Sequence, residues 1–257
     1  MSETSATAKP LTVMTVNVHK GFTFFNRKFI LPELRDAVRK IGADVVFLQE
    51  VLGTHEEHCK NKKFVGWPDA PHYEFLADSI WPQYAYGRNV VAPKSDHGNA
   101  VMSKFPIVHF QNHDVSMPGP EKRGLLHCVV RVPGQAQDVH CICVHLGLAE
   151  SHRLQQLDLL CEMVRGEVPD NAPLIVAGDF NDWRCRASGV LEREIGLKEV
   201  FVHAYGEPAK TFPARFPLLC LDRIYVRNAS VHLPVVLPRR PWSHLSDHAP
   251  LVAEIHL

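Results

Sequence analysis

The carboxylate and amide of Asp179 and Asn181 are the side chains best suited to chemistry, and they follow the short apolar segment 174–177. Residues two apart in extended backbone point to the same side. A carboxylate can take a proton from water or bind a metal, and an amide can donate to a phosphate oxygen. The pair therefore suits a phosphate site, although Gly-Asp and Asn-Asp sequences are also common in simple turns.

Glu50 and Asn17 follow two other apolar segments. Glu50 ends a predicted strand over 44–50, and Asn17 lies near the end of a predicted strand over 11–19. A carboxylate at a strand end suits Mg²⁺, which takes one or two protein carboxylates together with waters and substrate phosphate. The competing interpretation of Glu50 is a solvated strand terminus.

His248 and His145 also lie next to apolar segments that are predicted to be strands. Asp247 and His248 stand just before the last predicted strand, and both can serve one site only if they lie in a loop or at a strand start. Pro250 supports this, since proline avoids the interior of central strands. His145 ends the apolar stretch 141–144, and His140 should face the opposite surface of that strand. An ordinary polar loop and a core histidine are the structural alternatives.

The chain has 16 histidines, so pairs of them are candidate zinc ligands. His109 and His113 could share one face of a strand. No pair comes with a convincing third ligand, so a structural zinc site is not expected. Two further pairs are His55 with His58, in a highly charged segment, and His244 with His248, in a segment crowded by proline.

The elements that must position these residues are mostly strands. Helices are predicted where apolar residues recur at helical spacing, around 31–41 and 154–164, with a short helix over 71–80 and a long loop over 53–69. Few strands alternate regularly with helices, which disfavours a purely parallel sheet and favours two packed sheets with helices outside. The predicted strands cover 11–19, 44–50, 100–103, 107–110, 125–132, 138–146, 174–177, 221–226, 231–236 and 251–256.

Length and composition limit the number of domains and the cellular location that can be expected. The 257 residues suit one domain over 11–257, preceded by a flexible polar arm over 1–10. The arm lacks an apolar targeting core, and no apolar run approaches the ~20 residues that span a bilayer. Seven scattered cysteines indicate reduced thiols. We therefore expect a cytoplasmic monomer without a transmembrane segment.

The balance of charge bears on the partner. The chain has 28 basic and 28 acidic residues and a formal net charge of zero. Proteins that hold long nucleic acid by its backbone usually carry a basic excess. Nucleic acid is therefore a substrate that the charge does not favour, although a local basic patch would still allow it.

These motifs together resemble the endonuclease/exonuclease/phosphatase superfamily, which includes DNase I-like nucleases, inositol polyphosphate phosphatases and sphingomyelinases. The likeness is closest to its small bacterial metal-dependent hydrolases. Each motif is weak alone, but their order along nearly the whole chain is specific. The matching segments are Thr15-Val16-Asn17, Leu48-Gln49-Glu50, Gly98-Asn99-Ala100-Val101-Met102-Ser103, Val144-His145-Leu146, Gly178-Asp179-Phe180-Asn181, Leu221-Asp222-Arg223-Ile224 and Ser246-Asp247-His248.

The resemblance implies an α+β fold, a four-layer α/β/β/α sandwich of two mostly antiparallel sheets flanked by helices. It implies Mg²⁺, with Mn²⁺ as an alternative, held mainly by Glu50 with Asn17 and Asp247 nearby. The catalytic group that it implies is His145, Asp179, Asn181, Asp222 and His248. Within that group, Asp179 would orient or deprotonate water, Asn181 would hold a phosphate oxygen, and Asp222 would pair with His248.

Two departures separate this chain from the apurinic-site endonucleases of the superfamily. His19 stands where those enzymes usually have an acidic residue, and His145 stands where they have tyrosine. Asn99, Arg123 and His19 are the candidates for substrate binding.

The sequence therefore predicts a Mg²⁺-dependent phosphoesterase that hydrolyses a phosphodiester or phosphomonoester by water attack, with a small phosphoester or phospholipid headgroup favoured as substrate. A DNA or RNA endonuclease or exonuclease is the first alternative. A catalytically silent binding protein of the same fold is the second.

Overall fold

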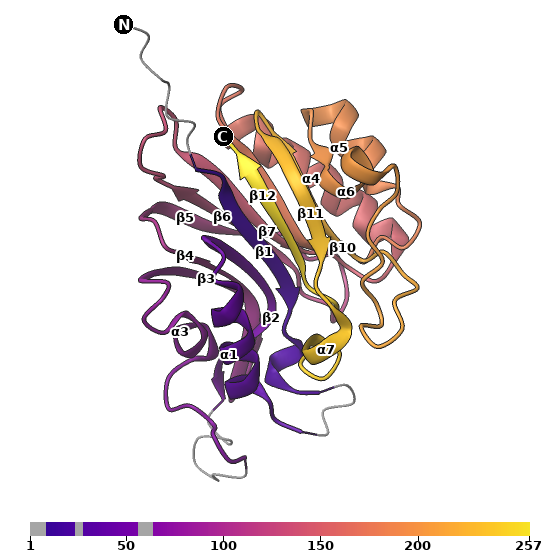
Figure 1. Ribbon diagram of the computed structural model, residues 1–257. Coiled ribbons are helices and arrows are strands. Elements are labelled where there is room, and N and C mark those ends of the chain that lie inside the picture. The colour runs from indigo at the N-terminus through magenta and orange to yellow at the C-terminus, as the bar shows by residue number, and fades with distance from the viewer. Residues whose placement is uncertain (1–8, 24–27, 56–63) are drawn as a thin grey trace, which may run out of the picture.

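Two six-stranded sheets pack face to face, and helices cover their outer surfaces (Figure 1). The structure is a computed structural model that describes residues 9–23, 28–55 and 64–257. The predicted four-layer sandwich is confirmed. The predicted arm over 1–10 lies almost wholly outside the described residues. None of the helices within the described ranges is both long and apolar enough to cross a membrane.

Sheet 1 has the strand order β11-β12-β1-β2-β4-β3. Within it, β1 and β2 are parallel neighbours, while the other neighbouring pairs are antiparallel. Its strands are β1 (Leu11–Asn17), β2 (Val45–His55), β3 (Gln83–Ala92), β4 (Ser95–Ser103), β11 (Ser230–Val236) and β12 (Leu251–His256).

Sheet 2 has the order β5-β6-β7-β8-β10-β9 and repeats the same plan. Here β7 and β8 are the parallel pair, and the remaining neighbours are antiparallel. Its strands are β5 (Ile107–Asp114), β6 (Gly124–Val130), β7 (Val139–His145), β8 (Leu174–Asp179), β9 (Lys198–Glu199) and β10 (Asp222–Arg227).

The two parallel pairs position the candidate chemistry. A parallel pair needs a crossover connection, and helix α1 (Leu31–Ile41) joins β1 to β2 as helix α4 (Glu150–Glu167) joins β7 to β8. The strands pair so that Asn17 lies beside Gln49, and His145 beside Asp179. The carboxyl ends of both pairs therefore bring polar side chains from each sheet to one end of the sandwich.

Apolar side chains fill three layers. One cluster lies between the sheets and includes Val13, Phe47, Cys141 and Ile175. A second lies between the outer face of sheet 1 and its helices, and a third between the outer face of sheet 2 and α4. Alternate residues of each central strand therefore face different layers, which explains why β7 and β8 are buried along their whole length.

Helix α1 forms as its sequence predicts. Pro32 lies in the first turn, where its missing N–H costs no hydrogen bond. Leu31, Leu34 and Val38 are buried on one face, and Gly42 ends the helix in the left-handed conformation with φ 61°. The short predicted helix over 71–80 is observed as α3 (His72–Ala77).

Several elements differ from the sequence prediction. The loop predicted from residue 53 is wrong at its start, because β2 continues to His55. Strand β3 was missed because it is an edge strand on which only Ala85 and Gly87 are buried, so its pattern is weak. The other missed elements are the 3₁₀ helix η1 (His19–Gly21), α5 (Ala187–Ile195), β9, α6 (Val200–Tyr205) and α7 (Arg239–Trp242).

Candidate active site

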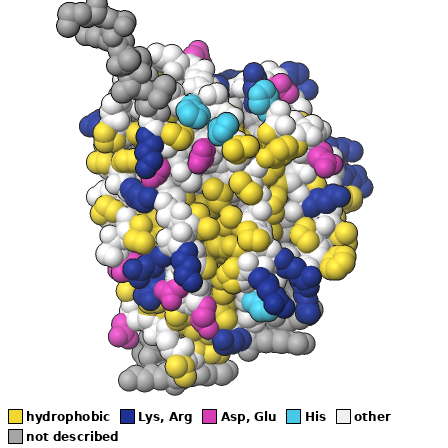
Figure 2. Space-filling view, viewed as in Figure 1, with side chains coloured by type: hydrophobic (Ala, Val, Ile, Leu, Met, Phe, Trp, Pro, Cys, Tyr) yellow, Lys and Arg dark blue, Asp and Glu magenta, His cyan; other side chains and the backbone are white. Residues whose placement is uncertain are grey.

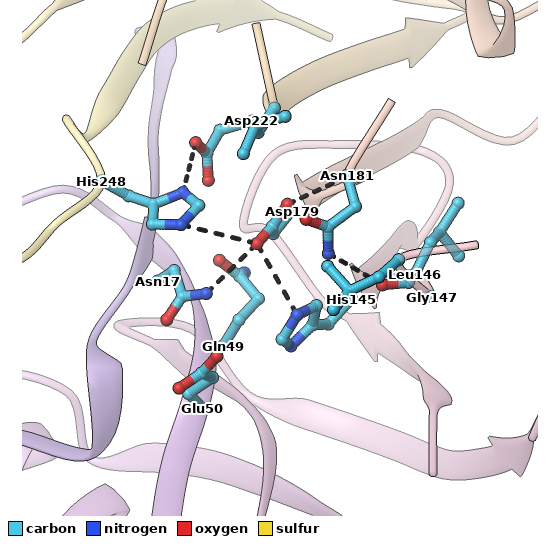
Figure 3. Close-up of polar contacts among 12 residues, drawn as sticks. Asn17, Gln49, Glu50, His145, Leu146, Gly147, Asp179, Asn181, Asp222 and His248 are labelled. Carbon is cyan, nitrogen blue, oxygen red and sulfur yellow. Dashed lines mark hydrogen bonds and ion pairs between the residues drawn. The ribbon is translucent and has the colours of Figure 1, made fainter. Parts of the chain in front are cut away.

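The Asp179 carboxylate lies at the centre of a cluster of polar side chains contributed by both sheets (Figure 3). Its Oδ2 accepts a hydrogen bond from Asn17 Nδ2 at 3.2 Å. The Nε2 atoms of His145 and His248 lie 3.6 and 3.8 Å from the same oxygen. Asp179 is 2% exposed, so one buried carboxylate oxygen faces an amide and two imidazoles.

A turn that begins at Asp179 shapes this part of the site. Asn181 N donates to Asp179 Oδ1 at 2.9 Å, and Asn181 has a left-handed φ of 50°, which asparagine tolerates. The Asn181 side chain donates to Leu146 O at 2.9 Å, which uses one of its two amide N–H groups. The expectation that the two side chains share a strand face is therefore wrong, because β8 ends at Asp179.

Glycine is required at position 178 by the neighbouring strand. Gly178 has a φ of 149°, and a Cβ there would collide with the carbonyl oxygen of Val144 on β7. The close approach lets β7 and β8 end side by side, with His145 paired to Asp179.

Glu50 occupies a β-bulge instead of the strand end that the sequence predicts. Leu48 pairs with Ala100 and Val51 with Gly98, so one extra residue is present in β2. Glu50 adopts a left-handed φ of 55°, and bulges commonly redirect a side chain next to a functional site. The bulge places this carboxylate at the site end of sheet 1, below Asp179 in Figure 3.

His19 lies between two carboxylates at the rim. Its Nδ1 is 3.7 Å from Glu50 Oε2 and 3.6 Å from Asp247 Oδ2. Its backbone N–H donates to Asn17 Oδ1 at 3.0 Å. Asp247 Oδ1 is buried and has no hydrogen-bond partner among the described residues. This carboxylate oxygen, together with Glu50, leaves oxygen ligands available for a hard divalent cation.

His248 is fixed by Asp222 and by its own loop. Asp222 Oδ2 lies 2.8 Å from His248 Nδ1, so Nε2 is directed toward Asp179. The His248 backbone N–H donates to Ser246 Oγ, which donates in turn to Asn17 O at 2.6 Å. These residues precede β12, so the sequence requirement that Asp247 and His248 lie in a loop is met.

The two catalytic histidine candidates differ in charge. Burial alone would lower the pKa of His248, but Asp222, Asp179 and Asp247 outweigh it and raise the pKa to about 10. Burial, reinforced by Arg123, lowers the pKa of His145 to about 4. At neutral pH the site therefore holds one imidazolium and one neutral imidazole.

Glu50 is ionised in this environment. Burial would raise its pKa, yet the neighbouring basic side chains His145, Lys20, His19 and His248 lower it overall. An ionised carboxylate at the mouth of the site is what a divalent cation requires of its ligand.

Two substrate-binding candidates lie further from the centre. Asn99 is fully buried, and its Nδ2 donates to Gly124 O and Cys143 O, which links sheet 1 to sheet 2. Arg123 Nε donates to Leu146 O at 3.1 Å, and its Nη2 pairs with Glu121. Arg123 therefore supports the loop that also receives the Asn181 amide.

Some residues of the site were not singled out from the sequence. His97, on β4, is close enough to Glu50, Lys20 and Arg123 for their charges to act on it, and burial lowers its pKa to about 4. Its position two residues before Asn99 was an available signal, because both then share a strand face. The ring of Phe212 lies 5.0 Å from that of His248, and no motif marked it.

A groove of about 950 Å³ opens beside the site and includes Asp247 in its wall. Phe216 and Leu245 contribute apolar surface, while Arg215 and Arg239 contribute positive charge. Figure 2 shows Lys and Arg side chains gathered over the region of α7, next to an apolar strip. The groove therefore suits an anionic molecule that also has an apolar part.

Comparison with known proteins agrees with this architecture. The chain is 59% identical over 245 residues to the uncharacterized protein YbhP of Escherichia coli (strain K12), covering 95% of this chain and 96% of that protein. The structure of an endonuclease/exonuclease/phosphatase from Beutenbergia cavernae DSM 12333 matches with a TM-score of 0.75 and 21% identity, over 97% of this chain and 72% of that chain.

A mannosyl-6-phosphatase of Bacteroides thetaiotaomicron VPI-5482, Bt3783, has a similar fold, with a TM-score of 0.71 and 17% identity over 96% of this chain and 100% of that one. At these identities the solved structures show a shared fold. The model of the Endonuclease/Exonuclease/phosphatase family matches residues 14–248, which include every candidate catalytic residue. The chain therefore belongs to the endonuclease/exonuclease/phosphatase family.

Proposed function

We propose that this protein is a Mg²⁺-dependent phosphoesterase, with Mn²⁺ as an alternative metal, that hydrolyses a phosphodiester or phosphomonoester by attack of water. The observation that carries the proposal is the environment of Asp179 Oδ2, which faces Asn17 Nδ2 and the Nε2 atoms of His145 and His248. This oxygen can orient a water and accept its proton, while the surrounding groups hold phosphate oxygens. Family membership supports a hydrolase acting on phosphoester bonds.

The metal is assigned to Glu50, Asp247 and Asn17. A bound cation would supply Lewis-acid stabilisation of charge on phosphate oxygens. The ligand atoms of Asp179, Asp222 and His248 also lie within 4.8 Å of one another. However, a protonated His248 whose Nδ1–H is directed at Asp222 has no lone pair for a metal, so that triad is better suited to acid–base work.

The histidines then have separate roles. His248, charged at neutral pH, places a proton on Nε2 where it can stabilise the phosphate or reach the leaving oxygen. Asp222 keeps that imidazole in one orientation. His145 contributes a neutral N–H donor, and Asn181 adds its amide, to hold the phosphate oxygens.

The side chains that line the groove favour one class of substrate. A small phosphoester or phospholipid headgroup combines an anionic group with an apolar part. Arg215 and Arg239 can contact the anionic group, and Phe216 and Leu245 can contact the apolar part. Long duplex nucleic acid is less suited, because the formal net charge of the chain is zero.

The test is turnover of an aryl phosphodiester in Mg²⁺, followed by a panel of phosphomonoesters, phosphodiesters, phospholipids and nucleic acids. Glu50→Ala and His248→Ala should each reduce turnover nearly to background while circular dichroism remains unchanged. Glu192→Ala, on the exposed face of α5, is the matched control and should keep full activity. Near-normal turnover in both site variants would overturn the assignment, and activity confined to nucleic acids would transfer it to a nuclease.

A further inference from the structure

A second cluster of metal-ligating side chains lies on the outer face of sheet 2. His113 comes from β5, His127 from β6, and Glu167 is the last residue of α4. His113 pairs with Leu125, and His127 is two residues further along β6, so both histidines face the α4 side of the sheet. His145 faces the opposite surface of the same sheet, so the cluster is separate from the candidate active site.

The ligand atoms converge on one carboxylate oxygen. Glu167 Oε2 lies 3.2 Å from His113 Nε2 and 3.2 Å from His127 Nδ1. All three ligand atoms lie within 4.8 Å of one another. Zinc bonds to nitrogen and oxygen are about 2.0–2.2 Å long, so neighbouring ligands of a tetrahedral zinc ion lie about 3.3 Å apart. Two of the three separations therefore already match.

Each imidazole presents the correct atom. His127 is 2% exposed, and its Nε2 lies 2.9 Å from His140 Nδ1, which leaves Nδ1 for Glu167. Zinc-bound histidines usually use their other nitrogen for such a hydrogen bond, which fixes the ring. His113 Nε2 is buried and has no hydrogen bond within the described part of the chain, although the carboxylate oxygen is close. A buried nitrogen without a hydrogen bond is available to a cation.

We propose that His113, His127 and Glu167 form a second metal site that binds Zn²⁺. Zinc is a borderline-soft ion that accepts two imidazoles together with one carboxylate, whereas Mg²⁺ prefers oxygen ligands such as those of Glu50 and Asp247. Three protein ligands leave a fourth position for water, because Glu167 is partly exposed and opens the cluster to solvent. The ion would tie β5 and β6 to the end of α4.

The sequence did not predict this site because its third ligand is remote. The sequence predicts that His109 and His113 can share a strand face, but Glu167 follows 54 residues after His113 and reaches it only through the packing of α4 on sheet 2. His109, exposed on the same face of β5, is not part of the cluster of three. It therefore serves as a matched control.

Equilibrium dialysis measures how much Zn²⁺ the full chain binds. The chain carries Glu50→Gln and Asp247→Asn, which remove the first metal site, so that only the second site is measured. Co²⁺ in place of Zn²⁺ adds a visible absorption band that is strong for four-coordinate and weak for six-coordinate ions. We expect one bound equivalent, and His113→Gln or Glu167→Gln should weaken binding at least about tenfold. His109→Gln should leave both the affinity and the Co²⁺ band unchanged.

Two results would overturn the site. Zinc binding that is unaffected by His113→Gln and Glu167→Gln would place the ion elsewhere. An equal loss in His109→Gln would mean that surface histidines collect zinc without a defined site. His113→Gln, Glu167→Gln and His109→Gln change no proposed phosphoesterase residue. When each is made in the otherwise native chain, Mg²⁺-dependent turnover should be retained, so this measurement tests the proposed function independently of the zinc site.

Discussion

The two oxygens of Asp179 have different tasks. Oδ1 accepts the Asn181 N–H and forms the turn, while Oδ2 faces Asn17 and the two histidines. The two interpretations of the sequence, a turn and a phosphate site, are therefore compatible, since the turn is what directs the second oxygen into the site.

This division predicts the behaviour of Asp179→Asn. The amide oxygen can still accept from Asn181, so the turn should persist, but the amide nitrogen cannot accept the Asn17 hydrogen bond, so the melting temperature should fall modestly. The amide cannot take a proton from water, so kcat should fall by about 10²–10⁴. Steady-state kinetics measures the change in kcat, and thermal melting measures the change in stability. A variant with near-normal kcat would exclude Asp179 from the acid–base role.

At the residue scale, the types of most site residues could be predicted but their geometry could not. Asn17, His145 and His248 converge on Asp179, as the ends of predicted strands suggested. Glu50 was placed at a strand end because the apolar run stops there. Its position in a bulge depends on how β2 pairs with β4, which a single segment of sequence does not specify.

At the element scale, helix α6 has an N-cap that also titrates. Glu199 Oε2 accepts from Val202 N at 2.6 Å, and burial of this carboxyl raises its pKa to about 7. Its ordinary pKa is 4.5. Between these values the folded chain holds a proton that the unfolded chain releases, so stability falls as pH rises through this window.

Glu199→Gln should remove this pH dependence, because its amide oxygen still caps the helix but has no proton to lose. The variant should match the parent near pH 4.5 and exceed it above pH 7 by up to about 3 kcal/mol. Urea unfolding across this range checks the difference, with Glu192→Gln as the exposed control. A difference that stays constant with pH would contradict the assigned shift.

Elements with strong periodicity were predicted, and those with weak patterns were missed. Helix α1 and strands β7 and β12 follow clear apolar spacing and lie where predicted. Strand β3 lies at an edge, where exposure allows Tyr84 and Arg88 and dilutes the pattern. Helix α5 buries Ala187, Leu191 and Ile195 at a spacing of four, so its signal was present but short.

At the scale of the whole molecule, the site exists only where the two sheets meet. Asn17 and Glu50 come from sheet 1, and His145 and Asp179 from sheet 2. Asn99 crosses between the sheets to donate to Gly124 O and Cys143 O. Local patterns favour two packed sheets with helices outside, and the resemblance of the ordered motifs predicts the four-layer sandwich.

The groove beside the site predicts how charge governs capture of substrate. Arg239→Glu should raise KM for an anionic substrate by about fivefold, since one exposed charge contact contributes roughly 1 kcal/mol. The change in kcat should be smaller, and added salt should reduce the difference between variant and parent. Arg193→Glu, on α5, is the control. Equal effects of the two reversals would exclude a specific role for the groove.

The position of β12 makes sheet 1 depend on segments that are far apart in the sequence. This strand lies between β1 and β11, with Leu11 beside Ile255, so β1 pairs with a strand that is remote in the sequence. Such distant pairing delays completion of the sheet. A nascent chain can already contain Glu50 and Asp179, but β1 lacks its second neighbour and the loop carrying His248 is not yet anchored. We therefore expect the loop that carries His248 to take its place beside Asp222 and Asp179 only after β12 has paired with β1.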